Sequence, residues 1–410
     1  MKTQRAATVA AMRPALIAVV ALVSAALGAS GALVLGKAVG WVDDDAGSVR
    51  TVLLSAEDAS RTSESASATP LVGNRFDPAA IFARSSPGVV TIYSSFPGGG
   101  RSQGSGFVVS EDGHVLTNSH VITNAGEGES TVRGAEKVFV VFSDGDRLPA
   151  SIVGWDLFDD TGLITFDPGD HAVSPIPLGN SDAVVVGEPV AAIGSPFGNE
   201  NSLAVGVVSA VSRSIPSLTS RYNVSNAIQI DAPINHGNSG GPLLDGRGRV
   251  IGVNAQIRSD SGNAEGVGFA IPINAARRSM EQLIATGRVA YAYIGITTLD
   301  VTPAIARRYD LGAQRGALIE EVVADAPAAR AGLEGAKRRV VFNGSPVSLG
   351  GDLIVSIAGR RVVRADDIAR IVTERLRPGQ LVPVTVVRGG TGARETVRVR
   401  LVERPANPRG

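Results

Sequence analysis

The sequence predicts a mainly β protein built as a barrel or a sandwich, with further segments at both ends. Between about residues 88 and 272, short alternating apolar strings recur, for example at 88–93, 138–142 and 250–254. Glycine-rich turns separate these strings, and 49 of the 410 residues are glycine. Regular short strands favour a barrel or a sandwich over repeated β–α–β units. The length allows two or three domains plus tails.

Charge and cysteine content argue against several functional classes. The 39 Lys and Arg residues balance the 39 Asp and Glu residues, so no nucleic-acid partner is expected. Arginines are frequent from Tyr291 onward, but they are scattered and are interpreted as solvated surface. The chain has no cysteine, which excludes disulfides, zinc–thiolate sites and a cysteine nucleophile. No metal or organic cofactor is expected.

The N-terminal segment predicts export from the cytoplasm. Residues 1–13 form a basic tail, and 14–38 contain an apolar run of about 22 residues, enough to span a ~30 Å hydrocarbon core. Acidic residues follow at 43–45, so the tail is expected in the cytoplasm and the rest of the chain outside. Small residues at 26–31 leave a cleaved signal peptide as the alternative. Residues 39–78, rich in Ser, Thr and Ala, are expected to form a flexible linker.

A β-hairpin carries the first candidate functional side chain, His120. Segments 104–109 and 113–121 are predicted to pair, with Glu-Asp-Gly at 111–113 as the turn. His120 lies at the end of the second strand, in the polar string TNSHV. A histidine in this position is either structural or a general base, and its partners must decide between the two.

The second candidate is Ser239, which follows the alternating strand 227–230 in a glycine-rich turn. Flanking glycines permit positive φ angles and let a substrate carbonyl approach closely. The N–H groups of Gly237 and Ser239 can then point at one spot, as an oxyanion hole requires. A serine hydroxyl becomes a good nucleophile only beside a base that a third group orients.

The third group is expected among the carboxylates of segment 153–164. Asp156, Asp159 and Asp160 are the candidates, and Asp156 is interpreted as a turn or surface residue. No candidate histidine follows Ser239, so the order serine, acid, histidine of α/β-hydrolases is excluded.

The strings TNSHV at 117–121 and GNSGGP at 237–242 resemble the HtrA family of trypsin-like serine proteases. The resemblance implies a chymotrypsin-like double β-barrel over 79–288. His120 and Asp160 would come from the first barrel and Ser239 from the second. Thr161 and Gly162 depart from the family pattern after the acid, so Asp159 remains a competitor for Asp160.

A helix and a second resemblance follow the protease region. Asn274 and Gly287 are expected to begin and end a linking helix. The strings at 293–296, 316–319, 322–333 and 351–357, then a helix at 366–375 and a strand at 381–388, resemble a PDZ (α+β) domain. This domain is expected at 289–405, with a tail at 406–410. The resemblance implies that its carboxylate loop, formed by Tyr293, Ile294, Gly295 and Ile296, binds peptide C-termini.

The combined resemblance implies a membrane-anchored, extracytoplasmic serine endopeptidase that cleaves unfolded or damaged proteins. His120 would act as base, Asp160 as its orienting acid and Ser239 as nucleophile. Gly237, Asn238 and Ser239 would form the oxyanion hole. The expected partners are unfolded proteins, C-terminal peptides, the membrane through the N-terminal helix, and two further copies in a homotrimer.

Three alternative functions are also compatible with the sequence. A signalling protease would cut one membrane substrate instead of many damaged proteins. A peptide-binding scaffold would keep the barrels without using catalysis. A serine esterase would use the same nucleophile but would leave the PDZ-like region without a role.

Overall fold

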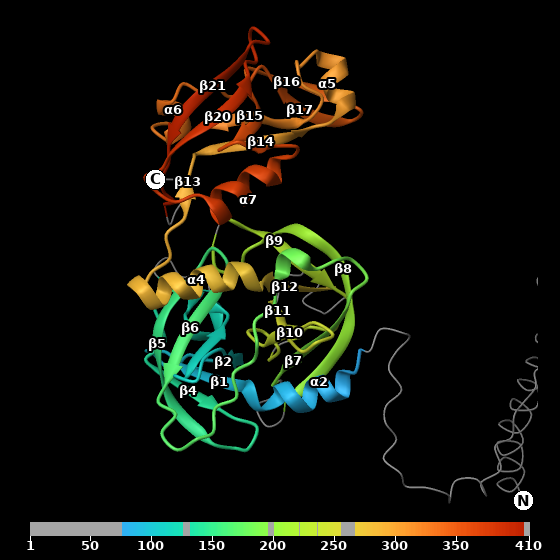
Figure 1. Cartoon of the computed structure of the whole chain (residues 1–410). Helices are drawn as coiled ribbons and strands as arrows, with labels where there is room; N and C mark the ends of the chain where they lie inside the picture. Colours follow the sequence, from blue (N-terminus) through green and yellow to red (C-terminus); the bar gives the residue numbers. More distant parts are fainter. Residues whose placement is uncertain are drawn as a thin grey trace, which may run out of the picture. The chain divides into compact units, whose positions relative to one another are not determined.

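The computed structural model describes most of the chain after the linker (Figure 1): residues 76–125, 132–195, 201–220, 222–235, 237–255 and 267–405. The predicted cytoplasmic tail, the membrane anchor, nearly all of the linker, the C-terminal tail and His236 lie outside these ranges. Across the described ranges, no helix combines the length and the apolar character needed to cross a membrane.

The first half of the protease region is a closed six-stranded barrel with the strand order β1-β2-β3-β6-β5-β4. The predicted hairpin is confirmed, because Phe107 pairs with Leu116 and Val108 with Val115. Strand residues that alternate toward the interior form the core, including Ile92, Val140 and Ile164. The elements are α2 (Pro78–Ser85), η2 (Ser86–Gly88), β1 (Val89–Ser95), β2 (Arg101–Val108), β3 (His114–Thr117), α3 (Ser119–Ile122), β4 (Lys137–Val141), β5 (Arg147–Asp156) and β6 (Thr161–Phe166).

The second half is another closed barrel, with the strand order β10-β11-β12-β9-β8-β7. Its elements are η4 (Ser181–Ala183), β7 (Pro189–Gly194), β8 (Ser202–Pro216), β9 (Asn223–Ile230), β10 (Pro242–Leu244), β11 (Val250–Ala255) and β12 (Gly268–Pro272). The chain is thus mainly β and forms barrels, not a sandwich, as the chymotrypsin-like expectation required.

The two barrels share one hydrophobic core. Phe107 and Leu163 of the first barrel join Ile193 and Val253 of the second in a single cluster of buried side chains. Helix α4 (Ile273–Thr286) contacts β5, β6, β11 and β12, and therefore covers strands of both barrels (Figure 1). A shared core fixes the barrels against each other, so side chains from each can form one site.

The ends of α4 partly match the prediction. Gly287 ends the helix in the left-handed conformation, with φ at 71°, as expected for a glycine after a helix. The expectation that Asn274 caps the start is wrong, because Ile273 is already helical and Pro272 is the N-cap. Proline fixes φ near the value that an N-cap needs, and the helix begins two residues earlier than a cap at Asn274 would allow.

The C-terminal domain is a twisted sheet with helices, in the strand order β14-β15-β18-β20-β21. Helix α7 places Ile368, Ile371 and Val372 in its core, at the spacing of one helical face. The strand predicted at 381–388 is β20, but β21 pairs with it along its whole length and continues the sheet. The elements are β13 (Ala292–Tyr293), β14 (Ile296–Val301), α5 (Pro303–Tyr309), β15 (Gly316–Val322), α6 (Pro327–Arg330), β16 (Arg338–Phe342), β17 (Ser345–Leu349), β18 (Leu353–Ile357), β19 (Arg360–Arg361), α7 (Ala365–Arg375), β20 (Leu381–Val387), β21 (Arg394–Arg400) and β22 (Val402–Glu403).

Candidate active site

His120 and Asp160 form a short side-chain pair at one end of the first barrel. His120 lies in α3, directly after β3, and Asp160 lies in the turn between β5 and β6. Strands β3 and β6 are neighbours in the barrel, which brings the two residues together. His120 Nδ1 lies 2.7 Å from Asp160 Oδ2, and the two side chains are only 18% and 5% exposed. The contact orients the imidazole, leaving Nε2 available for a second partner.

The backbone and side chain of Asp160 are held from several sides. Its φ of 45° is left-handed, which is uncommon for a residue other than glycine. Asp160 Oδ1 accepts hydrogen bonds from Ser119 Oγ at 2.7 Å and from the backbone N–H of His120 at 3.1 Å. Asn118 Nδ2 donates to the Asp160 carbonyl at 2.9 Å. These bonds offset the strained backbone and fix both carboxylate oxygens.

The pair also changes the basicity of the imidazole. Burial alone lowers the pKa of His120, whereas the charge of Asp160 and its hydrogen bond to the ring raise it. The net effect places the pKa of His120 above its ordinary value of 6.5. A histidine with this pKa can accept a proton near neutral pH, as a general base must.

The turn 237–240, called the nucleophile turn below, presents Ser239 from the second barrel. The Ser239 carbonyl accepts a hydrogen bond from the Ser105 N–H at 2.8 Å, and the Gly240 N–H donates to the Asn254 carbonyl at 2.9 Å. A Cβ at Gly240 would lie 2.2 Å from the Ser105 carbonyl oxygen and 3.1 Å from the Asn118 nitrogen. Gly240 therefore lets the turn pack against the strand end that leads into His120.

The Ser239 hydroxyl makes no hydrogen bond within the described part of the chain. Its Oγ is buried and lacks a hydrogen-bond partner there. A buried hydroxyl without a partner is uncommon, and such a group calls for an explanation such as a functional role. The hydroxyl is thus free to bond with a base or with a substrate.

Gly237 and Asn238, the other residues of the nucleophile turn, are also held by contacts with neighbouring strands. Gly237 has φ at 99°, which favours glycine, and its carbonyl accepts a hydrogen bond from Ser105 Oγ at 2.5 Å. Asn238 lies over Gly194, where an added Cβ would be 2.6 Å from the Asn238 Cα. Asn238 Oδ1 is buried without a partner among the residues that the structure describes. His236, which precedes the turn, is outside them.

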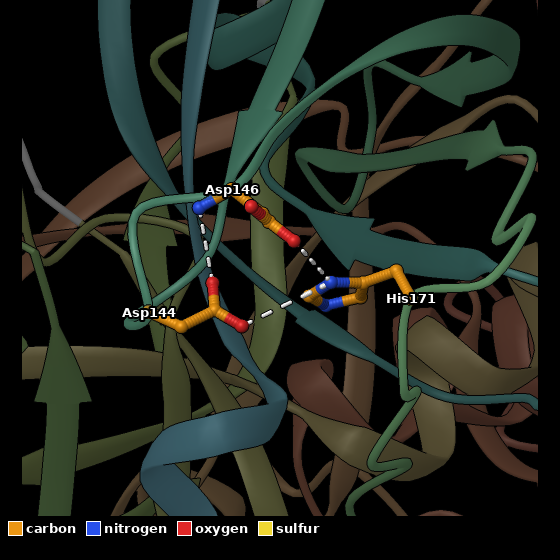
Figure 2. Close-up of side chains that lie close together, drawn as sticks. All are labelled: Asp144, Asp146 and His171. Atoms are coloured by element: carbon orange, nitrogen blue, oxygen red, sulfur yellow. Dashed lines mark hydrogen bonds and ion pairs between the residues drawn. The ribbon is translucent and has the colours of Figure 1, made fainter.

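Two other histidines serve local contacts. His114 Nδ1 lies 3.1 Å from Ser110 Oγ at the hairpin turn. His171 faces Asp144 and Asp146, with Nδ1 3.0 Å from Asp146 Oδ2 (Figure 2). Its ring also packs on Phe142. Both carboxylates are well exposed, so the three side chains form a surface cluster that joins two turns.

Asp159 and Asp156 do not contact His120 but meet at the hydroxyl of Tyr291. Tyr291 Oη lies 2.5 Å from Asp156 Oδ2 and 2.8 Å from Asp159 Oδ2. The interpretation of Asp156 as a surface residue is wrong, because it is 2% exposed and also accepts from Ser279 Oγ. Its role in the turn holds, since Oδ1 accepts the N–H of Phe158. The local sequence could not indicate this cluster, because Tyr291 lies 135 residues away from Asp156.

The residues proposed for peptide binding form the connection between β13 and β14. Gly295 has φ at 79°, and a Cβ there would lie 2.2 Å from Ala326 Cβ. The Ile294 carbonyl accepts from the Ala328 N–H, and the Gly295 carbonyl accepts from the Val323 N–H. Tyr293 ends β13 and Ile296 begins β14, so the turn is anchored on both sides.

Two closed barrels, a buried His–Asp pair and a serine in a glycine-rich turn define the class of trypsin-like proteins. The family model described as "Trypsin-like peptidase domain" matches residues 104–253. The solved structure of the HtrA-type protease AlgW with a tripeptide is 32% identical, with a TM-score of 0.66 over 80% of this chain and 98% of that one. The chain therefore belongs to the HtrA family of trypsin-like proteases.

Further relatives agree with this assignment. The serine endoprotease from Yersinia pestis is 28% identical, with a TM-score of 0.57 over 82% of this chain and all of that one. The probable periplasmic serine endoprotease DegP-like of Pseudomonas fulva (strain 12-X) is 37% identical over 317 residues, which is 76% of this chain. The chain spans only 59% of the length of that relative.

Proposed function

We propose that this chain is an extracytoplasmic serine endopeptidase that cleaves unfolded or damaged proteins. The observation that carries the proposal is the 2.7 Å contact between His120 Nδ1 and Asp160 Oδ2. The nucleophile turn lies beside it, and its buried Ser239 hydroxyl has no hydrogen-bond partner among the described residues. A serine protease requires a nucleophile, a base and a group that orients the base.

The chemistry follows from the groups in the site. His120 takes the proton of the Ser239 hydroxyl as Oγ attacks the peptide carbonyl, and a tetrahedral oxyanion forms. The N–H groups of Gly237 and Ser239, with Asn238 beside them, are proposed to bind the oxyanion. His120 then gives its proton to the leaving amine, and the acyl-enzyme forms. A water molecule, deprotonated by His120, releases the acyl group.

Asp160 acts in this scheme through the histidine. Its carboxylate keeps the proton of neutral His120 on Nδ1, so that Nε2 is the basic atom. It also stabilises the imidazolium after proton transfer, because the charges of Asp160 and the ring are opposite and both groups are largely buried.

The location of the protein is proposed from its N-terminal sequence and its relatives. The apolar run within 14–38 is proposed to be a retained anchor that leaves the catalytic region outside the cytoplasm. The Pseudomonas fulva relative is named periplasmic, which supports an extracytoplasmic location and equally suits a cleaved signal segment. Trimer formation is part of the same proposal.

The C-terminal domain is proposed to be a PDZ domain that binds the C-termini of peptides. An anchored turn at Gly295 next to the edge strand β14 suits a peptide that adds as a further strand. The AlgW structures in complex with a tripeptide and a decapeptide support peptide binding by this kind of chain.

The triad assignment is tested by substitution in the full chain, purified in detergent micelles. His120→Ala and Asp160→Asn should each lower kcat on fluorescein-labelled casein by several orders of magnitude, on the order of 10³ to 10⁵. His171→Ala is the matched control, because it removes a buried imidazole that pairs with surface carboxylates. A casein activity that survives Asp160→Asn but disappears with His171→Ala would contradict the assignment.

A further inference from the structure

The turn that carries Asp160 is clamped by a hydroxyl from outside the barrels. Asp156 and Asp159, which lie in or beside this turn, both place Oδ2 against Tyr291 Oη, at 2.5 and 2.8 Å. Tyr291 follows α4, and its side chain is buried. The turn is also tied to the second barrel, because Thr219 Oγ1 donates to the Leu157 carbonyl at 2.7 Å.

Counting hydrogens indicates that, up to a pH of about 6, the cluster holds one more proton than a tyrosine and two ionised carboxylates would. The Tyr291 hydroxyl carries one hydrogen and can donate it to one carboxylate only. The second oxygen-to-oxygen contact then needs a hydrogen from the other carboxyl group. If both carboxylates were ionised, one carboxylate oxygen would face a lone pair of the Tyr291 hydroxyl with no hydrogen between them. Such a contact inside the protein costs free energy.

The surroundings identify Asp159 as the protonated partner. Asp156 also accepts hydrogen bonds from Ser279 Oγ and from the Phe158 N–H, which stabilise its charged form. Among the described residues, Tyr291 alone contacts the Asp159 carboxyl group through a hydrogen bond. Burial and the neighbouring charge of Asp156 raise the pKa of Asp159 to about 6. The Tyr291 hydrogen bond opposes that increase.

Two arginines place positive charge near the carboxyl groups of the cluster. Arg278 of α4 and Arg404, which follows β22, both act to lower the pKa of Asp159. The Arg404 guanidinium lies over the rings of Phe158, Tyr222 and Tyr291, with 5.1, 4.9 and 5.2 Å to the centroids.

The position of Arg404 links this clamp to the C-terminal strand. The Arg404 N–H donates to the Tyr291 carbonyl at 2.8 Å, which extends the pairing of β13 with β22 by one residue. Cation–π contacts of this kind attract the arginine to the rings. Phe158 belongs to the same turn as Asp160. The turn is therefore contacted by Tyr291, which precedes β13, and by Arg404, which follows β22.

We propose that Tyr291 and Asp159 are positioning residues that hold the turn 157–160, so that Asp160 keeps its left-handed backbone and faces His120. This proposal rests on the proposed peptidase function of the same site. Neither residue touches the reacting atoms, and both act through Asp160.

The test uses a fluorophosphonate probe on the full chain in detergent micelles. The Ser239 oxygen forms a bond to phosphorus, fluoride leaves, and His120 takes the hydroxyl proton, so the rate reports the triad without a protein substrate. Tyr291→Phe should lower the limiting rate at least about tenfold, because small displacements of catalytic groups are this costly. It should also lower the apparent pKa of the reaction, because His120 loses the raising effect of Asp160. A purely structural role would not move that pKa.

Two Asp159 variants test the protonated form directly. Asp159→Asn keeps a donor toward Tyr291 and should retain the rate within about twofold, whereas Asp159→Ala should lower it about as much as Tyr291→Phe. This pair also decides the matter if Tyr291→Phe does not fold. Tyr309→Phe is the matched control, because its ring packs on Phe342 in the C-terminal domain.

The outcomes separate the two proposals. Wild-type protein that neither reacts with the probe nor cleaves casein would overturn the proposed function itself. Wild-type protein that reacts, with Tyr291→Phe and Asp159→Ala showing the same rate and the same apparent pKa, would overturn the positioning role alone.

Discussion

The raised pKa of Asp159 predicts a pH dependence of stability that one substitution should remove. The folded chain holds the Asp159 proton up to a pH of about 6, whereas the carboxyl has an ordinary pKa of 3.8. Between these values the folded state binds more protons than the unfolded state. The contribution of Asp159 is therefore fully present below pH 3.8, is lost as pH rises through about 6, and stays lost above it.

The size of the effect follows from the same pKa values. A separation of about two pH units corresponds to ~3 kcal/mol, at 1.36 kcal/mol for each unit. Asp159 is only partly buried, so solvent screening makes this figure an upper bound and about 2 kcal/mol the expected change. Asn at position 159 does not titrate, so the difference between the two proteins isolates this one group.

The assay is urea unfolding of the full chain in detergent micelles, with Ser239→Ala present to prevent self-cleavage. The free energy of unfolding is measured from pH 4 to pH 8 with Asp159 and with Asp159→Asn. We expect the Asp159 protein to lose about 2 kcal/mol relative to the Asn protein over this range. A difference that stays constant with pH would refute the assignment of a proton to Asp159.

Three further predictions concern the site itself. Because the pKa of His120 lies above 6.5, kcat/KM for casein should rise with pH with a midpoint above that value; a midpoint below 6 would contradict the pairing. Ser119→Ala removes a 2.7 Å hydrogen bond to Asp160 Oδ1 and should lower kcat about tenfold in steady-state assays; unchanged kcat would show that the bond is dispensable. Gly194→Ala would place a Cβ 2.6 Å from the backbone of the nucleophile turn and should lower probe labelling more than about tenfold, while Gly246→Ala, with 3.6 Å to its nearest neighbour, should not. Equal labelling of both glycine variants would refute the packing argument.

The sequence predicted the β architecture and the three proposed catalytic side chains, with Asp159 left as a competitor for Asp160. Short alternating strands between glycine-rich turns are a local pattern, and the barrels follow from it. His120 and Ser239 each stand in a motif of a few residues, which places them in a strand end and a tight turn. Motifs of this kind can be identified from the sequence because a few adjacent residues carry them, even though distant contacts such as Ser105 to Ser239 complete the turn.

The choice between Asp159 and Asp160 required the structure. Asp160 has a left-handed backbone, and this single dihedral angle directs its side chain to His120 while Asp159 faces Tyr291. The burial of Asp156 could not be predicted from the sequence either. Its donors are Ser279 in α4 and Tyr291 just after α4, and both lie more than 120 residues later in the chain. Such contacts depend on how α4 crosses the barrels.

We propose that Ser239 makes this chain a peptidase. The most direct test is incubation of the purified full chain with casein beside its Ser239→Ala variant, with the products identified by mass spectrometry. We expect internal peptide bonds of casein to be cleaved by the wild-type chain and left intact by the variant. Cleavage that persists in Ser239→Ala, or binding of casein without cleavage by the wild-type chain, would contradict the claim.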